Sequence, residues 1–215
     1  MKIGVIGATG GTGGLIVNQL IGAGHDVRAI VRRGADEDRL RATGAEVSTL
    51  DLTQAGAADA EASLSGLDVV INAAAARGTG GGQARAVDQD GVKAAIDAAK
   101  NAGVRRWIQI SMWGSDDPGR LPAMLRETGE AKRAADDHLA ASGMTWTVIR
   151  PPWLTDSPPD DRIIVGDQVE EGSIPRADVA AVAIACLDTD ATHDRLFEVT
   201  GGGDRSVRQA LAGLG

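Results

Sequence analysis

The 215-residue chain has very little of what several large classes of protein depend on. It contains no tyrosine, its aromatic residues make up only 2%, and Cys186 is its single cysteine. One cysteine excludes a fold held by internal disulfides, so Cys186 is expected to fill the core, with a catalytic thiol as the alternative. The net charge of -8 disfavours a nucleic acid or an anionic membrane as a partner. No apolar run approaches the length of a membrane span, and a strand expected from residue 2 leaves no space for a signal peptide, so we expect a cytoplasmic protein.

The remaining composition is that of a globular chain, with 43% hydrophobic residues and a core built mainly from Val, Ile, Leu and Ala. Helical stretches end in a glycine that is followed by a strand, as at Gly24 and Gly103. This alternation predicts an α/β fold: a doubly wound parallel sheet in a three-layer α/β/α arrangement, with residues 1–215 as one domain. We expect strands at residues 2–6, 26–31, 45–50, 67–72, 106–111, 145–150 and 197–200 and helices at about 84–101, 128–141 and 176–187. Ser206 is expected to cap a short terminal helix.

The first strand is followed by glycines at even spacing, Gly7, Gly10 and Gly13, and then by an apolar helical pattern. A strand that turns tightly into a helix leaves the first N–H groups of that helix unpaired, and these groups bind phosphate. A flexible loop is the alternative reading, but the position between a strand and a helix favours a nucleotide diphosphate. The residues expected to contact it are Gly7, Thr9, Gly10, Gly11, Thr12 and Gly13.

The second strand ends in Arg32 and Arg33, where an NAD site would carry an acidic side chain for the ribose hydroxyls. Guanidinium groups match a 2′-phosphate in charge and geometry, so these residues predict NADP(H). The alternative is a pair of solvated surface arginines. Asp51 is expected to accept a hydrogen bond from the adenine amino group with Leu52 beside the ring, although a turn or N-cap aspartate is nearly as well supported.

Two segments are expected to be irregular, residues 112–127 and residues 151 to about 162, and both follow strand ends on the cofactor side. We therefore place the substrate region at about residues 112–127 and 151–175. Its apolar side chains suit a flat apolar ring, with ordinary loop packing as the alternative: Met112, Trp113, Met124, Leu125, Trp153 and Leu154.

Motifs along nearly the whole chain resemble the atypical short-chain dehydrogenase/reductase group, specifically its NAD(P)H-binding members that are similar to NmrA-like proteins and flavin reductases. The matching segments are residues 7–13, 31–32, 50–52, 72–75, 102–106 leading to 110–111, Lys132 with 139–143, 147–151 with 154–156, and 172–180. The resemblance implies a Rossmann fold, a bound dinucleotide and a reductase-type activity. It also implies cofactor contacts from Ala73, Ala74, Ala75, Ser111, Lys132, Pro151, Trp153 and Leu154.

One position departs from that group, whose dehydrogenases generally place a tyrosine four residues before a lysine. Ser111 and Lys132 occupy the matching positions, but Thr128 stands where the tyrosine would be. The spacing puts Thr128 and Lys132 on one helix face, so both are expected to line the active site together with Ser111. An aliphatic hydroxyl is far less acidic than a phenol, which disfavours the usual alcohol–ketone chemistry. Ser111 is then expected to hydrogen-bond the nicotinamide or substrate, and Lys132 the nicotinamide ribose.

These observations predict an NADPH-dependent reductase that transfers hydride to a planar flavin- or quinone-like acceptor, which takes its proton readily from water. A non-catalytic NADP(H) redox sensor is the alternative, and a sugar-nucleotide epimerase a weaker one. No metal-ligand spacing occurs in the sequence. We expect a monomer or a homodimer.

Overall fold

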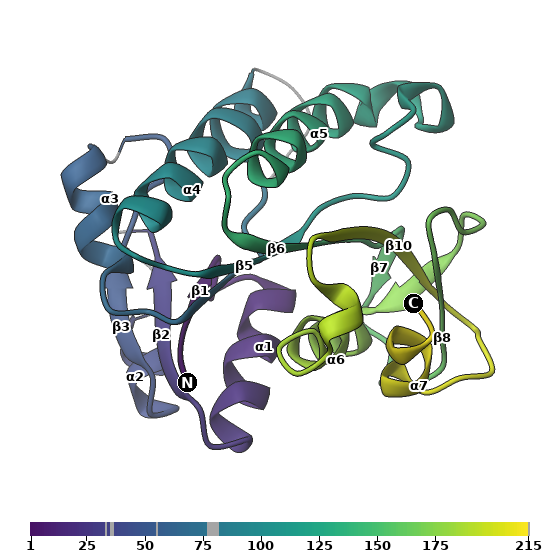
Figure 1. Ribbon diagram of the computed structural model, residues 1–215, viewed down its shortest axis with the longest axis horizontal. Coiled ribbons are helices and arrows are strands. Elements are labelled where there is room, and N and C mark those ends of the chain that lie inside the picture. Colours follow the sequence, from purple (N-terminus) through teal and green to yellow (C-terminus); the bar gives the residue numbers. More distant parts are fainter. Residues whose placement is uncertain (33, 35–36, 55, 77–81, 215) are drawn as a thin grey trace.

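The computed structural model describes residues 1–32, 34, 37–54, 56–76 and 82–214. Its central feature is a sheet with strand order β3-β2-β1-β4-β5-β6-β10-β8, covered on both faces by helices (Figure 1). Every neighbouring pair is parallel except β10 and β8, which are antiparallel. The predicted Rossmann-type α/β fold is therefore confirmed.

The strands of this sheet occur close to where the sequence predicts them, except β8, which was not expected. They are β1 (Lys2–Ile6), β2 (Asp26–Val31), β3 (Glu46–Thr49), β4 (Val69–Asn72), β5 (Arg106–Ile110), β6 (Thr145–Arg150), β8 (Ile163–Gly166) and β10 (Arg195–Gly201). The central strands β4 and β5 are buried along their whole length because helices cover both faces of the sheet.

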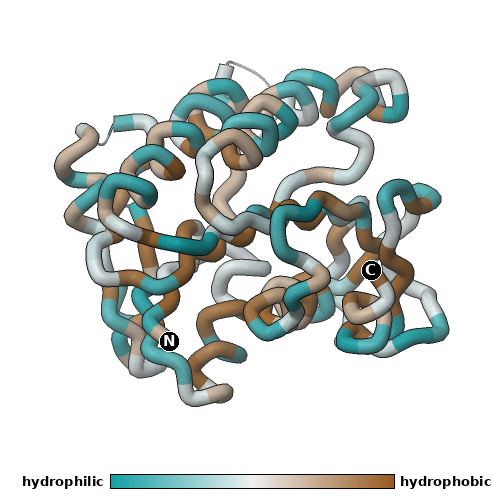
Figure 2. The backbone as a smooth tube through the Cα atoms, viewed as in Figure 1, coloured by the Kyte–Doolittle hydropathy of each residue, from teal (hydrophilic) through white to brown (hydrophobic). Residues whose placement is uncertain are grey.

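The helices divide the core into two apolar layers, one on each face of the sheet. The first layer packs α1 (Gly11–Gly22), α2 (Glu37–Ala42), α6 (Arg176–Ala185) and α7 (Val207–Ala212). The second packs α3 (Ala57–Leu64), α4 (Val92–Asn101) and α5 (Arg126–Ala140). Figure 2 shows hydrophobic residues gathered along the strands and along α1 and α6, whereas much of α5 is hydrophilic. Since α6 packs between α1 and α7, it is apolar on most of its surface.

Several elements differ from the sequence-based expectation. The helix expected over residues 84–101 begins as a π-helical segment, η1 (Ala84–Gly91), and becomes α-helical only in α4. The segment expected to be irregular after residue 151 contains β7 (Trp153–Thr155), which pairs with β9 (Ser173–Pro175) in a separate two-stranded sheet. Strands of three residues carry too short a pattern to be recognised without their partners. The predicted cap of α7 is confirmed, because the Ser206 hydroxyl accepts from the Gln209 amide in a capping box.

The chain order reverses between β1 and β4, which lie side by side in the middle of the sheet. At such a switch point the loops leaving the two strands diverge, and a crevice opens at the carboxyl ends of the strands. Gly7 follows β1, and Ala73 follows β4, so the segments that the sequence singled out meet at this crevice.

Candidate cofactor and active site

A cavity of about 860 Å³ opens at the carboxyl ends of the strands, near the upper end of the range of roughly 300–1,000 Å³ for ligand sites. The residues predicted from sequence that line it are Gly7, Thr9, Gly10, Gly11, Thr12, Arg32, Asp51, Leu52, Ala73, Ala74, Ala75, Ser111, Met112, Trp113, Leu125, Thr128, Lys132, Pro151, Trp153 and Leu154. Gly13 does not line the cavity, because it is buried in the turn behind it. Arg33 lies outside the described residues.

The glycine loop is closed so tightly that side chains are excluded from two of its positions. Gly7 has φ +80, and a Cβ on it would lie 2.7 Å from the Ala74 amide nitrogen. A Cβ on Gly13 would lie 2.2 Å from the Gly7 carbonyl oxygen. The loop therefore brings the start of α1 against the end of β1 with its backbone exposed to the cavity.

The N-terminus of α1 is built to receive an anion. Gly10 is the N-cap residue and offers no side-chain cap, and the first turn contains no acidic residue. The first amides of a helix have no partner within it, and they carry the positive end of its dipole. A diphosphate therefore fits this loop in both shape and charge.

At the far end of the loop, Arg32 and Asp51 lie on neighbouring strand ends. Arg32 is exposed and borders the cavity just beyond β2. Asp51 accepts hydrogen bonds from the Thr53 amide at 2.9 Å and hydroxyl at 2.7 Å, which makes it a turn aspartate that still faces the cavity. Those two bonds, with a smaller contribution from the charge of Arg32, lower the pKa of Asp51.

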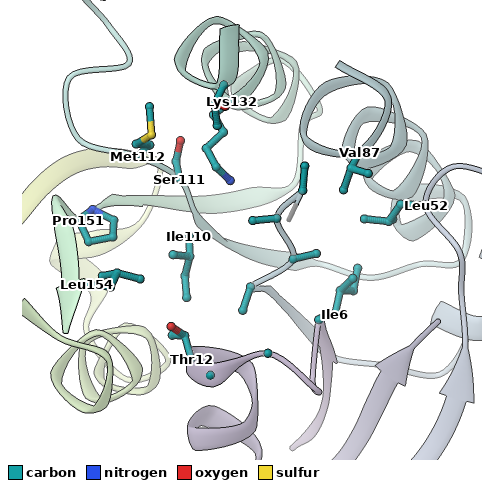
Figure 3. A pocket seen from close by; sticks show the side chains of 18 of the residues that line it. Ile6, Thr12, Leu52, Val87, Ile110, Ser111, Met112, Lys132, Pro151 and Leu154 are labelled. Carbon is teal, nitrogen blue, oxygen red and sulfur yellow. The ribbon is translucent and has the colours of Figure 1, made fainter. Parts of the chain in front are cut away.

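Lys132 is held by a partner that the sequence reasoning missed. Its ammonium nitrogen lies 2.9 Å from Asp88 Oδ1, and both side chains are buried. The other oxygen of Asp88 accepts from the Ala76 amide at 3.1 Å, so the carboxylate also ties down the segment after β4. Figure 3 shows the Lys132 amine pointing into the cavity from α5. The ammonium of Lys132 carries three N–H groups, which can donate to ribose hydroxyls while its charge is paired with Asp88.

Ser111 is also engaged by a buried acid. Its hydroxyl lies 2.7 Å from Asp136 Oδ2 and donates to it, and Figure 3 shows the Ser111 hydroxyl turned towards α5. The same oxygen accepts from Arg150 Nε at 3.2 Å and from its terminal nitrogen at 3.0 Å. Burial raises the pKa of Asp136 to about 6, against the opposing effect of the Arg150 charge. Because its one hydrogen goes to Asp136, Ser111 presents an oxygen acceptor to the cavity while that carboxylate is ionised.

One face of α5 thus carries Thr128, Lys132 and Asp136 at successive four-residue steps. Thr128 and Lys132 line the cavity, and Asp136 lies behind them in the core. In the sequence, the only trace of Asp136 is an acidic residue at helical spacing from Lys132. Such a residue is most often on a solvated face, so it was not singled out.

The cavity wall opposite the glycine loop is apolar. The buried side chain of Glu198 anchors the segments that form this wall. Trp113, Leu121 and Val169 form a small cluster, and the Trp113 indole nitrogen donates to the Val169 carbonyl at 3.0 Å. Met112 and Leu125 pack against this cluster and line the cavity. Met124, by contrast, is 66% exposed and lies outside the cavity lining.

Glu198 joins the segments that form this wall. Its carboxylate accepts from the Gly114 amide at 3.0 Å, the Val169 amide at 2.9 Å and the Arg120 guanidinium at 3.1 Å. Arg120 also lies over the Trp113 ring, 4.4 Å from its centroid. In the sequence, the sign of this role is that Glu198 is an acidic residue within an apolar strand.

Cys186 lies outside the cavity and is fully buried. Burial raises the pKa of the Cys186 thiol to about 12, so the cysteine packs in the core as an inert thiol. Within the part of the chain that the structure describes, no cluster of His, Cys, Asp or Glu side chains is suited to a metal ion.

A Rossmann-type sheet with a bare glycine loop at its switch point defines a dinucleotide-binding protein. The model of the NAD(P)H-binding family matches residues 7–190, and the chain belongs to this family. It therefore belongs to an NAD(P)-binding group of oxidoreductase and epimerase type, as the resemblance to atypical short-chain dehydrogenases implied. Among the described residues, no helix combines the length and apolarity needed to cross a bilayer.

Similar proteins carry both reductase and epimerase names. An uncharacterized sugar epimerase of Bacillus subtilis (strain 168), YhfK, is 35% identical, with 100% of each chain covered. A (4-alkanoyl-5-oxo-2,5-dihydrofuran-3-yl)methyl phosphate reductase of Streptomyces griseus is 30% identical over 98% of this chain and 71% of its own length. A solved Bacillus halodurans structure, provisionally named an NAD-dependent epimerase/dehydratase, is 28% identical, with a TM-score of 0.90 over 98% of each chain.

Proposed function

We propose that this protein is an NADPH-dependent reductase that delivers hydride to a planar, conjugated acceptor of the flavin or quinone type. The observation that carries the proposal is the composition of the cavity that joins the glycine loop to the substrate wall. Its catalytic corner holds Ser111, Lys132 and Thr128, with no phenol, and its wall is formed by apolar side chains such as Met112 and Leu154. The reductase name of the Streptomyces griseus relative supports the reaction type.

The reduced nicotinamide supplies the hydride when the cofactor is bound. The chain supplies position: the amides of the glycine loop bind the diphosphate, and the Lys132 ammonium, held by Asp88 at 2.9 Å, donates to ribose hydroxyls. Ser111 orients the nicotinamide amide or the acceptor through its hydroxyl oxygen. A conjugated acceptor spreads the incoming charge and takes its proton from water, so Thr128 is not required as an acid.

Arg32 is the residue that selects NADPH in this proposal. It is exposed at the end of β2, next to the cavity, where the adenosine ribose of a Rossmann cofactor lies. A guanidinium there attracts a 2′-phosphate and interacts far more weakly with an uncharged 2′-hydroxyl. Arg33 remains a second candidate, outside the described residues.

The test is NADPH oxidation with a panel containing menadione, FMN and riboflavin. Turnover is expected with at least one of them, and an Arg32→Ala variant should raise the KM for NADPH about tenfold without changing the KM for NADH. Arg105→Ala is the matched control, because Arg105 is an exposed arginine before β5, away from the cavity. Inertness across the panel, with the cofactor bound, would reject the reductase and favour an NADP(H) sensor.

A sugar-nucleotide epimerase is the second enzymatic candidate, and the name of the Bacillus subtilis relative favours it. An epimerase would need an acid–base group for the sugar hydroxyl, and Thr128 stands where a tyrosine would supply it. Conversion of a UDP-hexose into its epimer, with no net consumption of cofactor, would establish the epimerase over the reductase.

A further inference from the structure

Arg176 is the first residue of α6, and it lies across from the glycine loop rather than in the substrate region. A Cβ placed on Gly11 would come 2.9 Å from Arg176 Cδ and 3.2 Å from its Nε. The side chain of Arg176 therefore runs along the bare backbone at the first residue of α1. Gly11 allows this approach because it has no side chain.

The present partners of the Arg176 guanidinium are weak ones. One nitrogen lies 2.8 Å from Asp156 Oδ1 and 3.3 Å from the Leu154 carbonyl oxygen. The Asp156 side chain is 89% exposed, and an ion pair with so exposed a carboxylate contributes little stability. The guanidinium keeps N–H groups beyond those used here, since it carries five in a planar fork.

The other positively charged side chains that line the cavity lie elsewhere or are already paired. Among the described lining residues the positively charged side chains are Arg32, Lys132 and Arg176. Arg32 lies beyond β2 at the adenosine end, and Lys132 is paired with buried Asp88. Arg176 alone of the three lies against the start of α1.

We infer that Arg176 is a diphosphate-binding residue, which exchanges its surface partner Asp156 for the diphosphate held at the start of α1. A planar guanidinium can donate two parallel hydrogen bonds to phosphate oxygens. The Nε atom of Arg176 already lies 3.2 Å from the position that a Cβ on Gly11 would occupy. The helix amides supply donors from one side of the diphosphate, and Arg176 supplies them from the other. Because Arg176 also bonds the Leu154 carbonyl, the same side chain joins the bound cofactor to β7 in the substrate region.

This inference deepens the proposed function by adding a cofactor-binding residue, and it rests on dinucleotide binding rather than on turnover. Its test is titration calorimetry of the full chain with NADPH, NADH, ADP and AMP. An Arg176→Met variant should bind NADPH, NADH and ADP about tenfold more weakly. Its affinity for AMP, which lacks a diphosphate, should change far less. Arg32→Ala is the contrasting variant, because it should weaken NADPH alone.

Two variants disturb the same contact without removing the guanidinium. Gly11→Ala should displace the Arg176 side chain and weaken both dinucleotides, and adding Arg176→Met to it should then have little further effect. Asp156→Asn should release Arg176 and tighten both dinucleotides about twofold, but only while Arg176 is present. An equal effect of Asp156→Asn in both backgrounds would overturn the exchange of partners.

The outcomes separate this inference from the reductase proposal. Wild-type affinity for NADPH and NADH in a folded Arg176→Met variant would overturn the role of Arg176, whatever the turnover. Dinucleotide binding that depends on Arg176, without turnover on any acceptor, would reject the reductase and support the diphosphate contact. If Arg176→Met fails to fold, Arg176→Lys serves instead, since it keeps the charge but loses the paired geometry, and it should weaken both dinucleotides by a smaller factor.

Discussion

The glycine-loop side of the cavity and the apolar wall opposite it are held by different kinds of interaction. On the loop side, Gly13 lets the start of α1 touch the Gly7 carbonyl, and Gly7 lets the turn touch the backbone of Ala74, so close backbone approaches determine the shape. On the wall side, Glu198 collects donors from Gly114, Arg120 and Val169, which lie 29 to 84 residues away along the chain. The loop side is therefore a tight turn held by close backbone contacts, and the wall is an assembly of distant segments around one charge.

This difference suits the two tasks that we propose for the cavity. The diphosphate is the same in every dinucleotide, so a backbone cradle that admits no side chain is sufficient for it. The names of similar proteins point to different substrates, and loops joined by a few side-chain contacts can change without disturbing the sheet. Substitutions made on one side at a time therefore test whether the loop side and the wall act independently.

Gly13→Ala is expected to have the largest effect on stability and on NADPH binding, because the added Cβ clashes with the backbone of the loop side. Its Cβ would lie 2.2 Å from the Gly7 carbonyl oxygen, so the turn or the start of α1 must shift. We expect a loss of about 3 kcal/mol in the free energy of unfolding and loss of measurable NADPH binding. Urea denaturation and calorimetry measure the two effects.

Gly14→Ala is the matched control for that change. A Cβ on Gly14 meets only the Ala8 carbonyl oxygen, at an ordinary 3.5 Å, and the residue lies in α1. Alanine in a helix should raise the free energy of unfolding by about 0.5 kcal/mol, with NADPH affinity retained. Equal effects of the two substitutions would mean that the close turn does not determine the loop.

Glu198→Gln is expected to rank second and to act on the wall alone. The amide replaces one acceptor oxygen by a donor facing other donors, and it removes the charge that pairs with Arg120. We expect a loss of about 2 kcal/mol in the free energy of unfolding and faster hydrogen exchange over residues 112–121. Glu170→Gln, at an exposed position next to Val169, should change neither. A parallel loss of NADPH affinity would show that the two sides are coupled.

The glycine loop could be predicted from the sequence because its own residues are contiguous. Glycines directly after an apolar strand imply a tight turn and an exposed helix N-terminus, and all the predicted loop residues except Gly13 line the cavity. The fold followed from the same local signals, since glycines end helices and apolar runs form buried strands. The π-helical winding of Ala84–Gly91 carried no such signal, because its residues fit an α-helix equally well.

The partners of the predicted side chains could not be found in this way. Lys132 and Ser111 were singled out by position, but Asp88 and Asp136 reach them only through the packing of η1, α5 and β5. Arg176 likewise meets Gly11 across 165 positions of sequence, through the packing of α6 on α1. A charged residue in a helix or strand is usually solvated, so spacing alone does not reveal which ones are buried and paired.

The Ser111–Asp136 pair lies where the two sides meet, and it predicts an intermediate, pH-dependent effect. The pKa of Asp136 is raised by burial from 3.8 to about 6, so the folded chain takes up this proton at higher pH than the unfolded chain. The group's contribution to stability is therefore fully present below pH 3.8 and is lost as pH rises through about 6. From pH 7 to pH 5 it should raise the free energy of unfolding by about 1 kcal/mol.

The measurement is the difference between wild type and Asp136→Asn in urea denaturation at the two pH values. The carboxyl carbon resonance of Asp136, followed by NMR, should show a midpoint near 6. Protonation also weakens the hydrogen bond from Ser111 to Asp136, because a neutral carboxyl is a poorer acceptor, so NADPH binding should change over the same range. A midpoint near 4 would mean that the Arg150 pair outweighs burial, with Ser111 an acceptor at every working pH.

Trp153→Ala is expected to have the smallest effect on stability, and it tests whether Trp153 belongs to the wall or to the loop side. Trp153 is 52% exposed at the cavity rim, and its indole nitrogen donates to Glu171 at 2.8 Å on the surface. Its removal should change the free energy of unfolding by no more than about 0.5 kcal/mol, whereas loss of the buried Trp113 ring should cost about 3 kcal/mol. If the rim ring covers the acceptor, the KM for menadione should rise several-fold in Trp153→Ala while that for NADPH stays constant. An equal rise for both would instead place Trp153 against the cofactor, so that the loop side and the wall share this side chain.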